Sequence, residues 1–345
     1  MKENILRFFI EDEEIKEIEN AFIKDRRHPV KQLLQPRDRD KQVLINTNTA
    51  LNWIIKNNNL WLESVRQRLV NTDDFSASSS ALGEIRAYGY LLAADLEVLP
   101  IPETDISTPD FEVIQDKEKV LVEVHSKQYD GKEAKNLEKF NNESFTIDST
   151  KRVTIREHVV TPFGKPGSKE NISENVISRL ASIKSKETQF SATLPSILWL
   201  DFQDEMWDLT VNADGVNPIS TWNGELFAGE IWYAFYGIKG SPIFEGHSTE
   251  ERAVQEIIKM RHNGRFNNYS KIDGVVFSFP RLTFAIENPY SSKSIPGWFW
   301  KNFIKIPWFH LEYSRLNWPD KNLLQLIKLE TDKIMAFGKI PLYKW

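Results

Sequence analysis

The chain contains no cysteine and no long apolar run, and each absence excludes a class of protein. Without thiols it has no disulfide, no thiolate zinc site and no cysteine nucleophile. A membrane-spanning helix needs about 20 consecutive apolar residues, which no stretch approaches. The N-terminus runs from Met1 into the acidic stretch Glu11–Glu14 instead of an apolar leader. We therefore expect no signal peptide, no membrane partner and a cytoplasmic location.

The sequence also has no excess of positive charge. Lysine and arginine number 44 against 49 aspartate and glutamate, a formal net charge of −5. A dedicated DNA-binding domain is usually basic, so the total charge mildly disfavours nucleic-acid binding. Local charge matters more, and basic residues modestly outnumber acidic ones between Lys117 and Lys186. The sequence has no phosphate-cradling glycine loop, so ATP-driven function is unsupported. It also has no histidine pair at metal-ligand spacing.

The patterning predicts an α/β protein with three parts. A chain of 345 residues can bury a large core. Residues 1–75 read as an N-terminal helical region, with a serine-rich linker at 71–80. The remainder, 76–345, reads as one domain whose core spans 78–202. From Trp207 onward the chain is rich in aromatic residues, which we expect mainly in the core; stacking on single-stranded bases is the alternative.

A predicted helix at 81–92 carries an acid on its apolar side. Its apolar positions are Ala81, Ile85, Tyr88 and Leu92. Glu84 falls inside this arc, where burying a carboxylate costs several kcal/mol without compensation. The serines at 78–80 are the expected N-cap. Glu84 is expected either to help bind a cation or to pair with a core arginine.

Two predicted strands follow. Pro109 suits the start of a strand at 110–116, where Asp110 is the first residue. In the strand at 119–128, side chains alternate between two faces. One face carries Val120, Val122 and Val124; the other carries Leu121, Glu123, His125 and Lys127. This pattern favours a core strand beside a functional cleft, with a solvated edge strand as the alternative.

The ordered set of motifs resembles the PD-(D/E)XK nuclease superfamily, which has the restriction-endonuclease-like fold. Glu84 matches the helical acid, Pro109-Asp110 the proline-aspartate pair, and Glu123-Val124-His125 the third element. The resemblance implies an αβββαβ core with a mixed central sheet flanked by helices. It also implies a crossover helix at 174–190 and a fourth strand at 197–202.

The resemblance implies metal-dependent phosphodiester hydrolysis. Asp110, Glu123 and the Val124 carbonyl would bind Mg²⁺ or Mn²⁺, which prefer hard oxygen ligands. Glu84 would hold a second ion or an ordered metal-bound water. The expected partner is nucleic acid, DNA in the first place, and a homodimer is left open.

One position departs from the superfamily pattern, because His125 stands where the lysine is expected. We predict Lys127 as the replacement, since it lies on the same face about 6.6 Å along the strand. The alternatives are His125 itself, or Lys184 or Lys186 on the crossover helix. A catalytically inactive nuclease-like module that binds nucleic acid or protein is the rival interpretation. The loop at 260–266, with Arg261 and Arg265, is either a phosphate clamp or a surface turn.

Overall fold

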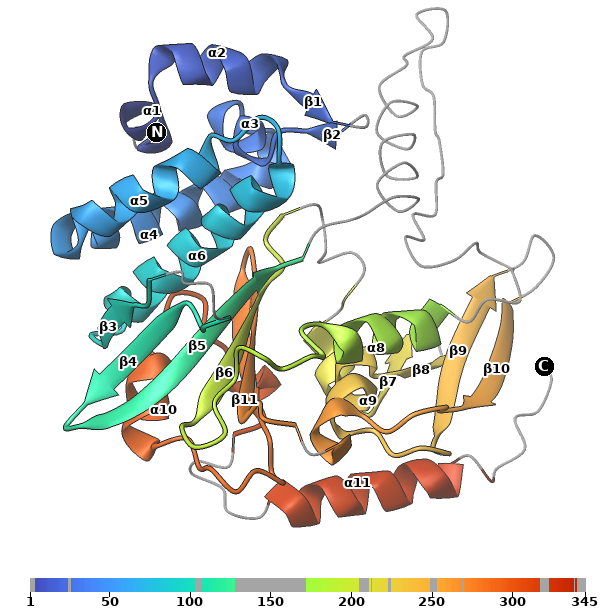
Figure 1. Cartoon of the computed structure of the whole chain (residues 1–345). Helices are drawn as coiled ribbons and strands as arrows, with labels where there is room; N and C mark the ends of the chain where they lie inside the picture. Colours follow the sequence, from blue (N-terminus) through green and yellow to red (C-terminus); the bar gives the residue numbers. More distant parts are fainter. Residues whose placement is uncertain are drawn as a thin grey trace, which may run out of the picture.

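The computed structural model is an α/β protein with a mixed sheet of six strands flanked by helices (Figure 1). The structure describes residues 4–23, 26–102, 107–127, 172–204, 211, 213–222, 225–248, 253–268, 270–316, 323–337 and 339. Within these ranges no helix has the length and apolar character needed to cross a membrane.

The helices and strands have the following bounds. The N-terminal helices are α1 (Leu6–Phe9), α2 (Asp12–Asn20), α3 (Pro29–Leu34), α4 (Lys41–Asn57), α5 (Asn59–Leu69) and α6 (Phe75–Ala93), and the later ones are α8 (Ile172–Ser182), α9 (Glu230–Tyr236), α10 (Gly297–Phe303) and α11 (Leu323–Phe337). The large sheet contains β3 (Glu97–Pro100), β4 (Phe111–Gln115), β5 (Glu118–Ser126), β6 (Ser196–Asp201), β11 (Gly274–Phe279) and β12 (Leu282–Glu287). Three separate pairs are β1 (Phe22–Ile23) with β2 (Arg26–Arg27), β7 (Ile219–Trp222) with β8 (Glu225–Ala228), and β9 (Pro242–Ser248) with β10 (Ala253–Lys259).

The sheet joins an antiparallel half to a parallel half. Its strand order is β12-β11-β6-β5-β4-β3. Strands β3, β4 and β5 form an antiparallel meander, and β6 then pairs parallel with β5. Strand β11 continues the parallel half, while β12 returns antiparallel. The predicted order of helix, three strands, helix and fourth strand is therefore observed.

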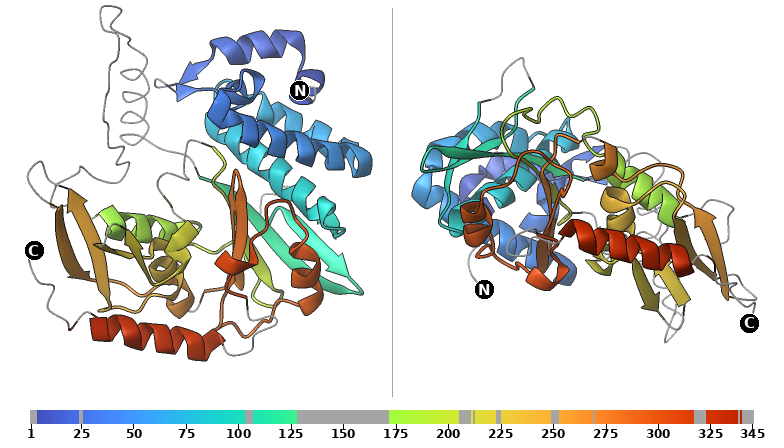
Figure 2. Two further views of the ribbon diagram at one scale, coloured as in Figure 1. Left: turned by 180° about the vertical axis from the view of Figure 1, so that it is seen from behind. Right: turned by 90° about the horizontal axis from the view of Figure 1, so that it is seen from below.

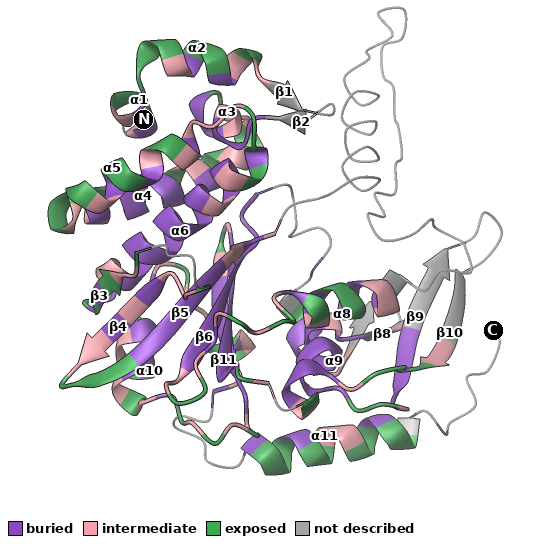
Figure 3. Ribbon diagram, in the orientation of Figure 1, coloured by how far each residue is buried: buried purple, intermediate pink, exposed green. Residues whose placement is uncertain are grey.

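The two faces of the sheet belong to two hydrophobic clusters. The valines at 120, 122 and 124 of β5 pack with α4, α5, α6 and α10. Leu198 and Leu200 of β6 lie on the opposite face and pack with α8, α9 and α11. Figure 2 shows the sheet between these two groups of helices, and Figure 3 shows its central strands largely buried. Strand β5 has partners on both sides, so a solvated edge strand is the wrong interpretation.

The helix that carries Glu84 is longer than predicted, because it begins inside the expected linker. Helix α6 starts at Phe75, and Asp74 is its N-cap, with Oδ1 accepting from the backbone N–H of Ser76 and Ala77. The serines at 78–80 therefore lie within the helix and do not cap it. An aspartate accepts from the first free N–H groups of a helix as well as serine does, so Asp74 sets the helix start.

The aromatic C-terminal third mainly fills the core, as expected. The buried aromatic side chains there include Trp232, Tyr233, Phe235, Tyr236, Phe299 and Trp300. Trp308 is 43% exposed, and its Nε1 donates to Asn46 Oδ1 at 3.0 Å. Trp207, Trp318, Gln128 and the side chain of Trp222 lie outside the described residues.

Close contact between α4 and α6 depends on Gly89. A Cβ at this position would overlap the backbone and side chain of Ala50. In an unobstructed helix, Gly→Ala stabilises by roughly 0.5–1 kcal/mol. We expect Gly89→Ala to destabilise the protein instead, by about 1–3 kcal/mol, because the two helices must separate. Urea unfolding measures this, and a stabilised variant would contradict the packing.

Candidate active site

Asp110 lies directly before β4 and its side chain turns onto β5. Strand β4 begins at Phe111, opposite Val122, so Val124 extends past the end of that ladder. The Val124 backbone N–H donates to Asp110 Oδ2 at 2.7 Å, and the Asp110 N–H donates to Val122 O at 3.1 Å. Two backbone contacts thus fix the carboxylate beside β5. The Val124 carbonyl as a metal ligand stays a prediction.

Glu123 supplies a second buried acid from β5. It is 1% exposed, and its Oε1 lies 2.7 Å from Nζ of Lys184. Its Oε2 is buried and receives no hydrogen bond from the described residues. An unsatisfied buried acceptor costs about 1–3 kcal/mol. This oxygen therefore needs a proton or a cation.

Asp110 and Glu123 interact directly. Burial and the negative charges of Glu123 and Glu84 raise the pKa of Asp110 well above its usual range. Burial also raises the pKa of Glu123, opposed mainly by the positive charge of Lys184. Two neighbouring buried carboxyl groups do not both ionise readily, so without a metal the protonated form of Asp110 is favoured.

Glu84 is buried on α6, as predicted, and pairs with an arginine. It is 7% exposed. Arg68 of α5 donates from Nη1 to Oε1 at 2.8 Å and from Nη2 to Oε2 at 2.6 Å. The pairing with a core arginine is therefore observed. The negative charge of Glu84 adds to the rise in the pKa of both Asp110 and Glu123, so its carboxylate lies near enough to act on theirs.

His125 provides no positive charge at neutral pH. Burial, together with the positive charges of Lys184 and Lys127, lowers its pKa to about 4. A neutral imidazole can still donate or accept a hydrogen bond. Lys127 lies near enough to act on this ring, and its predicted catalytic role stays a prediction. The lysine in direct contact with the acids is Lys184.

Lys184 lies in a turn after the crossover helix, not on it. Helix α8 ends at Ser182, eight residues before the predicted end, and the backbone at Lys184 has φ 53°. The left-handed conformation at this residue ends the helix and directs the lysine toward β5. Its Nζ also donates to Gln189 Oε1 at 2.9 Å. The apolar stripe of α8 could not reveal this, because the stop has no glycine or proline.

Arg265 holds this turn from the C-terminal third. Its side chain is 5% exposed and donates to the carbonyl of Ile183 and, at 2.7 Å, to that of Lys184. Its Nε also donates to Glu187 Oε1 at 3.3 Å. The prediction of a phosphate clamp is therefore wrong for Arg265, because its N–H groups donate to the backbone carbonyls that directly follow α8. Arg261 is exposed and pairs with Glu174 at 3.0 Å.

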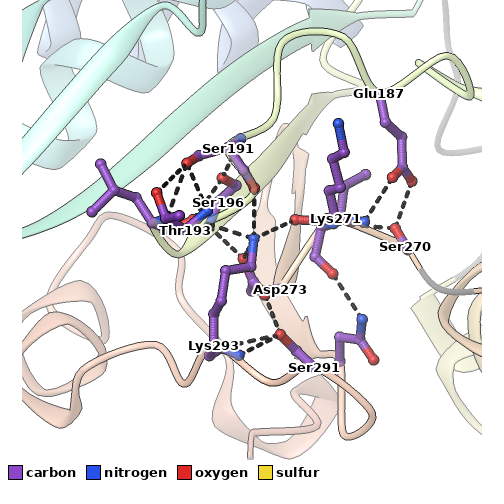
Figure 4. A network of polar contacts seen from close by, with 12 residues as sticks. Glu187, Ser191, Thr193, Ser196, Ser270, Lys271, Asp273, Ser291 and Lys293 are labelled. Atoms are coloured by element: carbon purple, nitrogen blue, oxygen red, sulfur yellow. Dashed lines mark hydrogen bonds and ion pairs between the residues drawn. The ribbon is translucent and has the colours of Figure 1, made fainter.

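A polar network anchors the same turn to the starts of β6 and β11 (Figure 4). Glu187 accepts at 2.6 Å from both Ser270 Oγ and the Lys271 backbone N–H. Lys293 Nζ donates to the Lys271 carbonyl at 2.9 Å and pairs with Asp273 at 2.9 Å. Asp273 in turn accepts from the Ser196 N–H at 2.6 Å. The Nζ of Lys293 thus has its partners within the fold, and the residue has a structural role.

Sequence reasoning missed a second buried charge cluster beneath the site. Arg86 of α6 is fully buried and pairs with Asp201, at the end of β6, and with Asp204 at 2.8 Å. Burial raises the pKa of Asp201 to about 6. Gly83 permits this approach, since a Cβ there would overlap Ser126 Oγ. The sequence did contain a signal for this cluster. It is an arginine two residues after Glu84, on a helix with no polar face.

The donor set fits Mg²⁺ or Mn²⁺. Magnesium binds one or two carboxylates and keeps several waters, which suits Asp110 and the unsatisfied oxygen of Glu123. Within the described part of the chain no three acid, histidine or cysteine side chains form a complete ligand group. Comparison with family models, curated proteins and solved structures gives no match.

Asp110→Asn should stabilise the metal-free protein at alkaline pH. A carboxyl whose folded pKa is raised favours folding at low pH, and this stability is lost as pH rises toward that pKa. Asparagine has no charge to lose, and its Oδ1 can still accept from Val124. In EDTA, the free energy of unfolding of the variant should exceed that of wild type at pH 8 by more than at pH 5.

Glu112→Gln is the matched control for this substitution. Glu112 lies on β4 and pairs with the half-exposed Lys119 at 2.8 Å. A surface pair contributes about 0–1 kcal/mol, so little change at either pH is expected. Equal pH dependence of wild type and Asp110→Asn would contradict the raised pKa of Asp110.

The ring of His125 should titrate near pH 4, and Lys184→Ala should raise its pKa. The reason is that the charge of Lys184 disfavours the imidazolium. His28 is the control. Burial lowers its pKa to about 4 as well, but Lys184 does not contribute to that shift. Its Nε2 contacts the Asn71 carbonyl at 3.1 Å. In an NMR titration, the pKa of His125 should differ between wild type and Lys184→Ala, and that of His28 should not. An unchanged His125 would place Lys184 elsewhere.

Proposed function

We propose that this chain is a PD-(D/E)XK-like nuclease that hydrolyses phosphodiester bonds, in DNA in the first place, with Mg²⁺ or Mn²⁺. The observation that carries the proposal is the buried pair Asp110 and Glu123 with Lys184 Nζ 2.7 Å from Glu123. The pair lies where the antiparallel meander meets the parallel strands. The order of elements supports a restriction-endonuclease-like core.

Each side chain has a role in this proposal. Asp110 and Glu123 would hold the ion, which lowers the pKa of a bound water and neutralises charge on the phosphate. Lys184 would position the attacking water and stabilise developing negative charge beside Glu123. His125, being neutral, would orient that water by a hydrogen bond. Glu84 completes the acidic cluster from α6.

The rival is a silent module that binds nucleic acid without cleaving it. One observation favours it: the strand position of the superfamily lysine holds a histidine whose pKa is lowered to about 4. The pair of Lys184 and Glu123 would then be only a buried ion pair. Cleavage assays separate the two functions.

Lys184→Ala should reduce DNA cleavage by about 10²–10³-fold, since one preorganised charge contributes that much. Plasmid, linear and single-stranded DNA are incubated with Mg²⁺, Mn²⁺ or EDTA. Mn²⁺ binding, measured by calorimetry, should persist because both carboxylates remain. Lys186→Ala is the control, since Lys186 is an exposed residue of the same turn.

Lys127→Ala tests the prediction from sequence in the same assay. If it abolishes cleavage and Lys184→Ala does not, the catalytic lysine is Lys127, directly after β5. If wild type cuts no substrate with either metal, the silent module replaces the nuclease.

A further inference from the structure

Both carboxylate oxygens of Glu84 are already occupied. Arg68 binds them through two parallel hydrogen bonds of 2.8 and 2.6 Å. Such a bidentate pair is the strongest geometry available to these groups. Glu84 is 7% exposed, and the Arg68 side chain is 30% exposed. Each carboxylate oxygen keeps a second lone pair, but a cation bound there would lie beside the positive guanidinium, which disfavours it.

The charges at the site argue against a second divalent ion. Three carboxylates converge, Glu84, Asp110 and Glu123, with two cations in direct contact, Arg68 and Lys184. When all are ionised the net charge is −3 + 2 = −1. One divalent ion brings it to +1, which matches the single negative charge of a phosphodiester. A second would bring it to +3, and the nearby Lys127 would add to that excess.

We propose that Arg68 takes the place of a second metal ion, so that the site binds one divalent cation between Asp110 and Glu123. This inference rests on the proposed function. Arg68 is a positioning residue: it neutralises Glu84 and keeps it from becoming a ligand. It belongs to α5, so the N-terminal helical region contributes a fixed cation to the site.

Calorimetric titration with Mn²⁺ tests the proposal. Wild type should bind one ion at this site. Arg68→Gln should bind a second, because Glu84 becomes available and the net charge falls by one. The double variant Arg68→Gln/Glu84→Gln should return to one ion. Arg68→Lys keeps the charge and should also bind one, which guards against a poorly folded glutamine variant.

Arg66→Gln is the matched control. Arg66 lies on the same helix and is also paired with acids, at 2.7 Å from Glu11 and from Glu14. It should bind one ion, as wild type does. Thermal unfolding gives a second readout: Mn²⁺ should raise the midpoint of Arg68→Gln more than that of Arg66→Gln, because it relieves an unpaired buried acid.

The outcomes separate the two proposals. Two ions bound to wild type, or one ion bound to a folded Arg68→Gln, overturns the role of Arg68 and leaves a metal-dependent nuclease intact. Absence of binding to wild type overturns the metal site itself and, with it, this inference. One ion in wild type and two in Arg68→Gln is the result that supports it.

Discussion

The burial of three acids at one point is the constraint on which the site depends. Glu84, Asp110 and Glu123 come from a helix, a strand start and a strand, and each ionised carboxylate loses hydration when buried. The fold compensates in three ways: Arg68 pairs with Glu84, Lys184 pairs with Glu123, and the pKa of Asp110 is raised so that its protonated form is favoured. A divalent cation would stabilise the ionised form of Asp110 instead.

These compensating groups come from distant parts of the chain. Arg68 precedes the sheet, and Lys184 follows the crossover helix. Lys184 is not held by its own element alone, because Arg265 and Glu187 close the turn in which it lies. The position of one ammonium group therefore depends on contacts that reach across the parallel half of the sheet.

Much of this arrangement could be predicted from sequence. Alternation in β5 separated the valines from Glu123 and His125, and helical spacing placed Glu84 in the interior. The start of α6 was missed because Asp74 outcompeted a plausible serine cap. The end of α8 was missed because Lys184 adopts a left-handed conformation without glycine. The pairing of Arg86 was missed, and the role of Arg265 was misassigned, because their partners lie 115 and 81 residues away in the sequence.

The contacts of Arg265 also bear on the order in which the protein becomes competent during synthesis. All three acids and Lys184 have been translated by the time β6 is complete. The groups that hold the lysine turn, Arg265, Ser270 and Lys271, lie 81 to 84 residues after the turn residues that they contact. A nascent chain that ends before them contains all three acids and Lys184 without the contacts that fix the turn. Under the proposed function, a ribosome-bound chain would therefore stay inactive until its last third emerges.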